Sequence, residues 1–174
     1  AKTLEEIATK GSNGFYRGYI AQRLVTGARD AGGIWCLEDL ARYHVVERKP
    51  LVDTIGNIKF ITVAPPSSGG VALMSILKQI NGFGVVTLDE NKQHIVVEAM
   101  RRAYRDRAEY LGDNDFVDVP VARLVSDEHA DKLRASIDID NATPSTELSP
   151  IAVSENAGTD TTHFSIIDSA GNRV

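Results

Sequence analysis

The sequence predicts an α+β fold that is mostly helical, with a hairpin near residues 45–63 and a terminal strand near residues 161–168. Three observations support this prediction. Apolar residues recur at intervals of three and four in several segments, which is the spacing of a buried helix face. The turn sequence TIGN separates two strand-like stretches of the hairpin, and apolar and polar residues alternate in the last segment. The chain has 174 residues, which is the size of one domain.

The first third of the chain is expected to be helical. Thr3 and Glu6 have the spacing of a capping box, so a short helix is predicted over residues 3–10. Apolar residues then recur at helical spacing over residues 15–30. Residues 37–43 are expected to add one or two helical turns.

The hairpin is expected to lead into three further helices. Pro50 lies in its first strand, which suggests an edge position or a bend. Residues 65–70, PPSSGG, break the second strand and are predicted to be a tight turn that requires glycine. The helix that follows is predicted to bury four residues at three-residue spacing, Val71, Met74, Leu77 and Ile80. Longer helices are predicted over residues 90–111 and 126–137, the second with Ser126 as its N-cap.

Residues 138–160 differ in composition from the rest of the chain. They contain two prolines, five acidic residues and neither lysine nor arginine. This composition predicts an exposed, mobile connector. The chain is therefore expected to consist of a body (1–137), the connector (138–160) and a final segment (161–174).

Charge and composition exclude several classes of function. The formal net charge of −5 argues against general binding to nucleic acid or to anionic membranes. The single cysteine, Cys36, excludes an intrachain disulfide and a thiolate metal cluster. No apolar run approaches the length of a membrane span, so no span is predicted. The four histidines do not have the spacing of metal ligands, so no metal site is predicted.

The predicted helix at 90–111 contains a cluster of arginines that could be taken for a nucleic-acid site. Acidic residues alternate with these arginines at spacings of three and four residues, which favours a solvated, ion-paired helix face. The arginines concerned are Arg101, Arg102, Arg105 and Arg107.

Thr161 opens the last predicted strand directly after the connector. A threonine hydroxyl is a weak nucleophile, but at a chain N-terminus the residue's own α-amine, with a pKa near about 8, acts as its base. Cleavage between Asp160 and Thr161 would create that terminus. On strand propensity alone, a structural threonine is the simpler interpretation.

Five blocks of sequence closely resemble the γ-glutamyltranspeptidase family, the glutathione hydrolases. They occur in the family's order and approximate spacing. The blocks are GFYRGYIA (14–21), EDLARY (38–43), APPSSGG (64–70), EAMRRAYRDRAEYLGDNDFVDVPV (98–121) and TTHFSIIDSAGNRV (161–174).

The resemblance implies a fold and a mechanism. The fold is the αββα sandwich of N-terminal-nucleophile hydrolases, whose precursors cut themselves into a large and a small subunit. Thr161 is then the catalytic nucleophile, and Asp160–Thr161 is the autocleavage bond. The expected substrates are glutathione and other γ-glutamyl amides, with water, amino acids or peptides as acceptors. The resemblance implies no metal or organic cofactor, and it assigns no substrate-binding residue within this chain.

The resemblance also implies that the chain is a piece of a proenzyme. It would span the second half of the large subunit and the first fourteen residues of the small subunit. Its partners would then be the missing segments of both subunits, which carry the remaining active-site groups, so the piece alone is expected to be inactive and to remain uncut. The bacterial members are usually exported, which implies a periplasmic or extracellular parent.

Two alternatives remain open. One is a related amidase of the same fold, such as a β-lactam acylase or a poly-γ-glutamate depolymerase. The other is a non-catalytic domain that only folds or docks to a partner.

Overall fold

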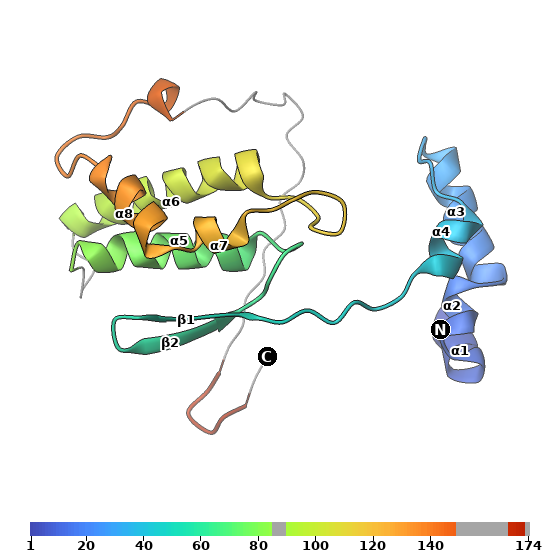
Figure 1. Cartoon of the computed structure of the whole chain (residues 1–174). Coiled ribbons are helices and arrows are strands. Elements are labelled where there is room, and N and C mark those ends of the chain that lie inside the picture. Colours follow the sequence, from blue (N-terminus) through green and yellow to red (C-terminus); the bar gives the residue numbers. More distant parts are fainter. Residues whose placement is uncertain (85–89, 149–166, 173–174) are drawn as a thin grey trace. The chain divides into compact units, whose positions relative to one another are not determined.

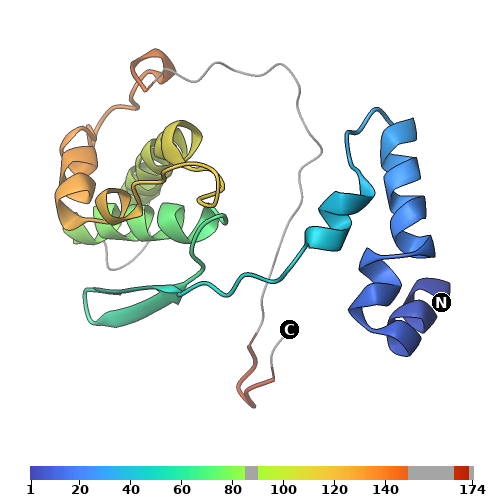
Figure 2. The ribbon, with the colours of Figure 1, turned by 45° about the vertical axis from the view of Figure 1, so that its right-hand side comes forward.

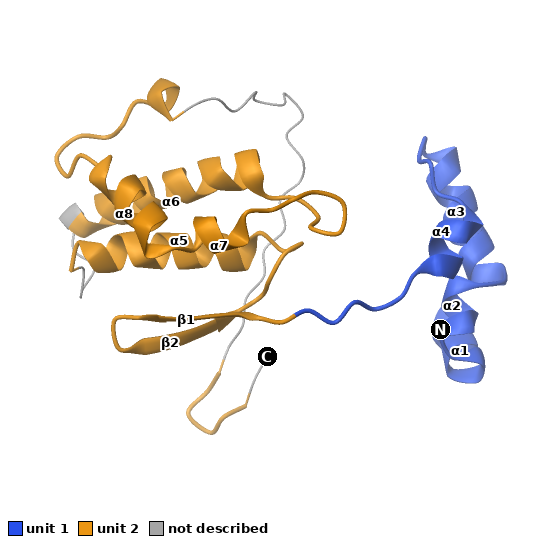
Figure 3. Ribbon diagram, in the orientation of Figure 1, with its two compact units in different colours: residues 1–48 blue, residues 49–174 orange. Residues whose placement is uncertain are grey.

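The computed structural model describes residues 1–84, 90–148 and 167–172. The chain forms two compact units, residues 1–48 and residues 49–174, shown in Figures 1 and 3. The first unit contains helices, and the second contains a β-hairpin together with helices. The prediction of a mostly helical α+β chain is therefore confirmed. None of the described helices combines the length and the apolar composition that crossing a membrane requires.

The first unit is built from four helices, with Ile20, Ala21 and Val25 buried. The capping box predicted at Thr3 is wrong, because the first helix starts one residue earlier and has no side-chain cap. The helix predicted over residues 15–30 is divided in two, because Gly18 has a φ of 72°, which lies outside helical geometry. The four helices are α1 (Lys2–Lys10), α2 (Ser12–Tyr16), α3 (Tyr19–Asp30) and α4 (Leu37–Arg42).

The predicted hairpin is present in the second unit. Strands β1 (Leu51–Ile55) and β2 (Ile58–Thr62) pair in antiparallel register, with Leu51 opposite Thr62. The first strand begins directly after Pro50 and is shorter than predicted. Proline has no N–H to donate to the partner strand, which is consistent with its position just outside the ladder.

The hairpin is followed by helices that form the core of the second unit, seen from a second direction in Figure 2. Helix α5 packs against α6, α8 and β1. The N-cap predicted at Ser126 is confirmed, since its hydroxyl accepts a hydrogen bond of 3.1 Å from the backbone N–H of His129. The elements are α5 (Gly69–Gly82), α6 (Glu90–Tyr110), α7 (Val121–Leu124), α8 (Asp127–Ala135) and the 3₁₀ helix η1 (Ser145–Glu147).

The buried face of α5 differs from the predicted stripe. Val71 and Met74 are buried as predicted, whereas Leu77 and Ile80 are only half-buried. The fully buried residue near the end of the helix is Gln79, whose side-chain amide donates to the hydroxyl and the carbonyl of Ser75, both at 3.2 Å. Because α5 has neighbours on several sides, its buried surface is wider than a single apolar stripe.

Lys78 joins α5 to its two neighbours through ion pairs. Its ammonium lies 2.6 Å from Asp53 of β1 and 2.8 Å from Asp127 of α8, and its side chain is 9% exposed. Burial lowers the pKa of Lys78, but the hydrogen bonds to Asp127 and Asp53 outweigh burial and raise the pKa above its ordinary value. The hairpin and α8 are therefore both held to α5 by one charged side chain.

Gly70 allows the connection from β2 to α5 to close tightly, as the sequence predicts for PPSSGG. A Cβ at this position would lie 1.9 Å from the carbonyl oxygen of Val63. We expect Gly70→Ala to destabilise the fold by about 1–3 kcal/mol, because backbone must move to relieve the clash. Thermal unfolding followed by circular dichroism measures the loss.

The neighbouring glycine is a matched control for this substitution. A Cβ at Gly69 would meet no atom closer than Ser67 Oγ at 3.6 Å, which is an ordinary contact. Gly69→Ala should therefore retain the wild-type melting temperature or raise it slightly, since alanine favours the helix. Equal melting temperatures for the two variants would show that the turn does not depend on glycine.

Candidate functional site

The predicted autocleavage bond lies outside the described residues. Asp160 and Thr161 belong to residues 149–166, and the described residues nearest to them in sequence are Leu148 and Ile167. Most of the strand predicted over 161–168 lies in the same range. The roles of Asp160 and Thr161 therefore stay predictions, and the structure bears on the segments that flank them.

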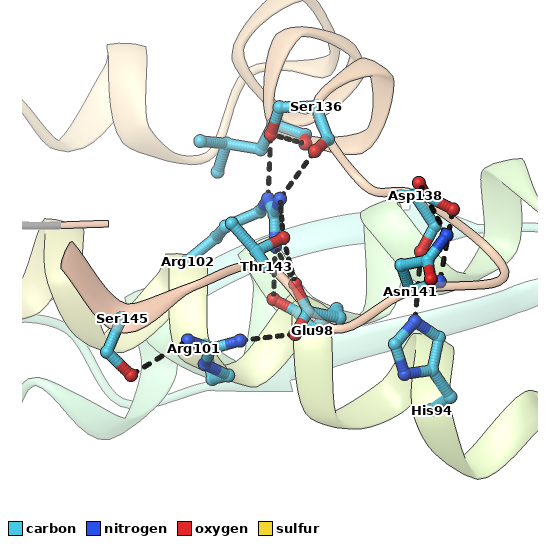
Figure 4. A network of polar contacts seen from close by, with 10 residues as sticks. His94, Glu98, Arg101, Arg102, Ser136, Asp138, Asn141, Thr143 and Ser145 are labelled. Atoms are coloured by element: carbon cyan, nitrogen blue, oxygen red, sulfur yellow. Dashed lines mark hydrogen bonds and ion pairs between the residues drawn. The ribbon is translucent and has the colours of Figure 1, made fainter. Parts of the chain in front are cut away.

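One face of α6 holds the segment that leads toward this bond. Four side chains of the helix are spaced by four, seven and eight residues, so they share a face. Figure 4 shows them directed toward residues 136–145, which follow α8. We call this set the α6 clamp, and it consists of His94, Glu98, Arg101 and Arg102.

Arg102 is the centre of the α6 clamp. It is 1% exposed, although arginine is almost never fully buried unless it is paired. Its Nε donates to Ser136 Oγ at 2.7 Å, and its Nη2 donates to the Ser136 carbonyl at 2.6 Å and to Thr143 Oγ1 at 3.1 Å. Its Nη1 donates to the Glu98 carbonyl at 3.2 Å and to Glu98 Oε2 at 2.6 Å. All five N–H donors of the guanidinium therefore have an acceptor.

Glu98 supplies the negative charge of this cluster and is also 1% exposed. Its Oε2 accepts a second hydrogen bond from the Thr143 hydroxyl at 2.6 Å, and its Oε1 accepts one from Arg101 Nη1. Burial raises the pKa of Glu98, but the hydrogen bonds from Thr143, Arg102 and Arg101 outweigh burial and lower it from 4.5 to about 2. The carboxylate is therefore charged at neutral pH, and Thr143 contacts both members of a buried ion pair.

Two weaker contacts extend the α6 clamp on either side of Thr143. Arg101 Nη2 donates to Ser145 Oγ at 3.1 Å, and His94 Nε2 donates to the Asp138 carbonyl at 2.9 Å. The Asp138 carboxylate in turn accepts the backbone N–H groups of Asp140 and Asn141 and the Asn141 amide, which lowers the pKa of Asp138. The start of the predicted connector is thus hydrogen-bonded to α6. The mobility of residues 138–160 stays a prediction.

The prediction of a solvated, ion-paired face for the α6 arginines is partly wrong. The ion pairs are present, but Arg102 is buried and Arg101 is only 25% exposed. The reason is that acceptors from the chain after α8 cover this face. Spacing within the helix reveals the pair of Glu98 and Arg102, whereas nothing local in the sequence identifies Thr143, which lies 41 residues beyond Arg102.

Residues 168–172 form a turn on the other side of the predicted autocleavage bond. Asp168 Oδ1 accepts the backbone N–H groups of Ala170 and Asn172, both at 2.9 Å, and the Asn172 amide donates to Asp168 Oδ2 at 2.6 Å. These hydrogen bonds, with the one from the Asn172 side chain the largest, lower the pKa of Asp168. The side chain of Asp168 therefore closes the turn as an Asx-type motif.

No metal centre is found among residues 1–84, 90–148 and 167–172. No group of three or more His, Cys, Asp or Glu side chains in these ranges is arranged to hold an ion.

Comparison with known families gives a match along the entire chain. The family model described as Gamma-glutamyltranspeptidase matches residues 1–174. The chain belongs to the γ-glutamyltranspeptidase family. This confirms the resemblance that the five sequence blocks indicate.

Curated relatives agree with this assignment. The glutathione hydrolase proenzyme of Pseudomonas sp. (strain A14) is 40% identical over 177 residues, which cover 100% of this chain and 31% of that protein. The glutathione hydrolase proenzyme of Escherichia coli (strain K12) is 38% identical, over 100% of this chain and 30% of that protein. The Acylase ACY 1 proenzyme of Pseudomonas sp. (strain SE83) is 33% identical, over 100% of this chain and 31% of that protein. The chain thus spans about 31% of the length of the first of these relatives.

Solved structures support the same fold. Helicobacter pylori gamma-glutamyltranspeptidase matches with a TM-score of 0.76 and 40% identity, over 91% of this chain and 46% of that chain. A cephalosporin acylase from Bacillus halodurans matches with a TM-score of 0.70 and 28% identity, over 78% of this chain and 25% of that chain. The chain is therefore part of the αββα sandwich of N-terminal-nucleophile hydrolases, as predicted.

Proposed function

We propose that the parent of this chain transfers the γ-glutamyl group of glutathione and related amides to water or to an amine. The observation that carries the proposal is the family match over residues 1–174, together with glutathione hydrolase proenzymes that are 38% and 40% identical. Thr161 is the proposed nucleophile, because it opens the TTH block of the family directly after the connector. Amino acids and peptides are the proposed acceptors.

The first proposed step is autoproteolysis. The Thr161 hydroxyl attacks the carbonyl carbon of Asp160, the new C–O bond replaces the C–N peptide bond, and the hydroxyl proton passes to the released amine. Water then hydrolyses the resulting ester, which leaves a carboxylate on Asp160 and a free α-amine on Thr161. The large and small subunits are thereby separated at the residue that carries out the next reaction.

The second proposed step is turnover by the new N-terminus. The α-amine of Thr161 accepts the hydroxyl proton while Oγ attacks the γ-glutamyl amide carbon, and the leaving amine departs with that proton. The resulting γ-glutamyl ester is then attacked by water or by an acceptor amine, which restores the hydroxyl. An α-amine is suited to this task because its ordinary pKa of about 8 lies close to neutral pH. Neither step, as proposed, uses a metal or an organic cofactor.

A second candidate function is hydrolysis of another amide by the same nucleophile. The acylase proenzyme that is 33% identical and the cephalosporin acylase structure with a TM-score of 0.70 favour this candidate over other enzyme classes. It differs from the first candidate in the acyl group that reaches Thr161, and not in the nucleophile.

The test is an assay of the purified, full-length parent on matched substrates. We expect release of p-nitroaniline from γ-glutamyl-p-nitroanilide, faster release when an acceptor dipeptide is added, and hydrolysis of glutathione. A glutaryl-β-lactam should be turned over more slowly than either γ-glutamyl substrate. Preference for the glutaryl-β-lactam would favour the acylase, and failure on all three substrates by correctly cleaved protein would contradict both candidates.

The 174-residue chain, produced by itself, is the control for this assay. We propose that it neither turns over γ-glutamyl-p-nitroanilide nor cuts itself, because it spans about 31% of the length of a glutathione hydrolase proenzyme. Removing even one oxyanion-hole donor from an enzyme typically costs about 10²–10³ in rate. Intact mass after prolonged incubation, together with the absence of p-nitroaniline, checks this expectation.

A further inference from the structure

We propose that the second unit contains a binding site for a small organic anion, in a cavity where α6, α7 and α8 meet (Figure 1). The ligand class is a molecule that carries carboxylate or phosphate groups on a short carbon skeleton. This site goes beyond the proposed function, because no step of the reaction at Thr161 is assigned to it. Three features of the cavity support the assignment: its size, the charges that line it, and the way those charges are held.

The cavity has a volume of about 520 Å³. Ligand pockets typically measure roughly 300–1,000 Å³, so it can hold a molecule of several carbon atoms as well as a single anionic group. One face of α8 forms much of its wall, since His129, Lys132 and Leu133 follow helical spacing of three and four. Ser136, four residues after Lys132, continues this face. The other residues that line the cavity are Arg105 of α6, Arg123 of α7, the N-cap Ser126 and Glu128.

Basic side chains predominate in the lining of the cavity. Arg105, Arg123 and Lys132 carry three positive charges against the single carboxylate of Glu128, and His129 adds a fourth basic group. The whole chain has a formal net charge of −5, so this concentration of positive charge is local. A hollow lined by one sign of charge raises the local concentration of ligands of the opposite sign. The cavity therefore favours an anion over a neutral or cationic ligand.

Arg123 is the side chain best placed to bind an anionic group. Its guanidinium lies over the ring of Tyr110, with Cζ 4.3 Å from the ring centroid. A guanidinium held over an aromatic face keeps the N–H groups at its edge for another partner, and its fork matches a carboxylate or a phosphate. Among the residues that the structure describes, none forms an ion pair or a hydrogen bond with this guanidinium. The ring of Tyr110 thus orients a cation that no described carboxylate neutralises.

Asp106 holds two other basic groups at the cavity. It is 5% exposed; its Oδ2 lies 2.6 Å from His129 Nε2, and its Oδ1 accepts a hydrogen bond of 3.2 Å from Arg105 Nη2. One buried carboxylate therefore fixes an arginine of α6 and a histidine of α8, and its charge reduces the local excess of cations without cancelling it. Lys132 is less restrained, because its ion pair with Glu128 is exposed and exposed pairs contribute little.

Isothermal titration calorimetry of the purified, full-length parent tests the site. The probes are citrate, which supplies carboxylates, and glycerol 3-phosphate, which supplies a phosphate, with glycerol as the uncharged control. The test variants are Arg123→Gln and Lys132→Gln, which remove a charge from the cavity and keep most of the side-chain length. Lys59→Gln makes the same change at an exposed position of β2.

We expect each anion to bind the wild type at one site per chain at low salt, and glycerol not to bind. Arg123→Gln should weaken the binding about tenfold, which is the loss expected for one hydrogen bond to a charged group. Lys132→Gln should weaken it less, since the side chain of Lys132 is 69% exposed, and Lys59→Gln should bind as the wild type does. Tighter binding of citrate would assign the site to carboxylates, and tighter binding of glycerol 3-phosphate would assign it to phosphates.

Three results would overturn the assignment: no binding of either anion to the wild type, equal affinity of the wild type and Arg123→Gln, or equal weakening by Lys59→Gln. If Arg123→Gln does not unfold cooperatively, Lys132→Gln decides the question. Weakened binding by this variant then supports the site, and unchanged binding contradicts it. Calorimetry does not depend on cleavage at Asp160–Thr161, so an uncut parent that binds the anions would contradict only the proposed function.

Discussion

Thr161→Ala leaves the full-length parent as a single uncut chain, and its γ-glutamyl turnover falls by at least about 10⁴-fold. Alanine removes the only oxygen of the side chain, so neither the ester of autoproteolysis nor the ester of turnover can form. Both losses follow from one atom, which is why this substitution has the largest expected effect on function. Denaturing gels report the cleavage, and release of p-nitroaniline from γ-glutamyl-p-nitroanilide reports the turnover.

Thr161→Ser is the matched control for this variant. Serine keeps the hydroxyl and, once the chain is cut, the adjacent α-amine, so measurable cleavage and turnover should return at reduced rates. Serine lacks the methyl group of threonine, so its χ1 torsion angle is less restrained. An alanine variant that is cut normally, or that retains full activity, would remove Thr161 from the mechanism.

Arg102→Ala destabilises the second unit by about 3–5 kcal/mol, which is the largest expected effect on stability. The guanidinium is 1% exposed and pairs with Glu98, which is equally buried. Its removal leaves a buried carboxylate without its main partner and deprives Ser136 and Thr143 of their donor. Arg107→Ala on the same helix is the control, because Arg107 is exposed and should cost at most about 1 kcal/mol.

The pH dependence of the unfolding free energy tests whether the charge of Glu98 is the cause of the destabilisation expected for Arg102→Ala. The pKa of Glu98 is lowered from 4.5 to about 2 in the folded chain, so its contribution is fully present above about pH 4.5 and is lost as the pH falls toward 2. A shift of this size corresponds to about 3 kcal/mol. The difference in unfolding free energy between wild type and Glu98→Gln should therefore shrink as the pH falls from 5 to 2. A difference that stays constant over this range would attribute the effect to packing.

The sequence predicted the elements that local patterns determine. The hairpin, the N-cap at Ser126 and the long helix at 90–111 all depend on residues close together in the chain. The break at Gly18 was missed because apolar spacing continues across it, and only the backbone conformation of the glycine interrupts the helix.

The candidate site was predicted less completely, for a physical reason. A family block predicts Thr161 as the nucleophile, which stays a prediction, whereas the spacing of charges along the helix predicts a solvated face where the α6 clamp lies. A helix sequence shows which charges can pair along it, as Glu98 and Arg102 do, and does not show what covers that face. The covering groups, Ser136 and Thr143, belong to a segment whose composition predicts exposure.

The most direct measurement of the central claim is the N-terminal sequence and mass of each chain in the purified, active parent. The account predicts two chains, the smaller of which begins Thr161-Thr162-His163 with an unmodified α-amine. It also predicts that brief incubation with a γ-glutamyl substrate adds one γ-glutamyl group to that terminal residue. A fully active parent that consists of one uncut chain, or whose smaller chain begins at another residue, would contradict the account.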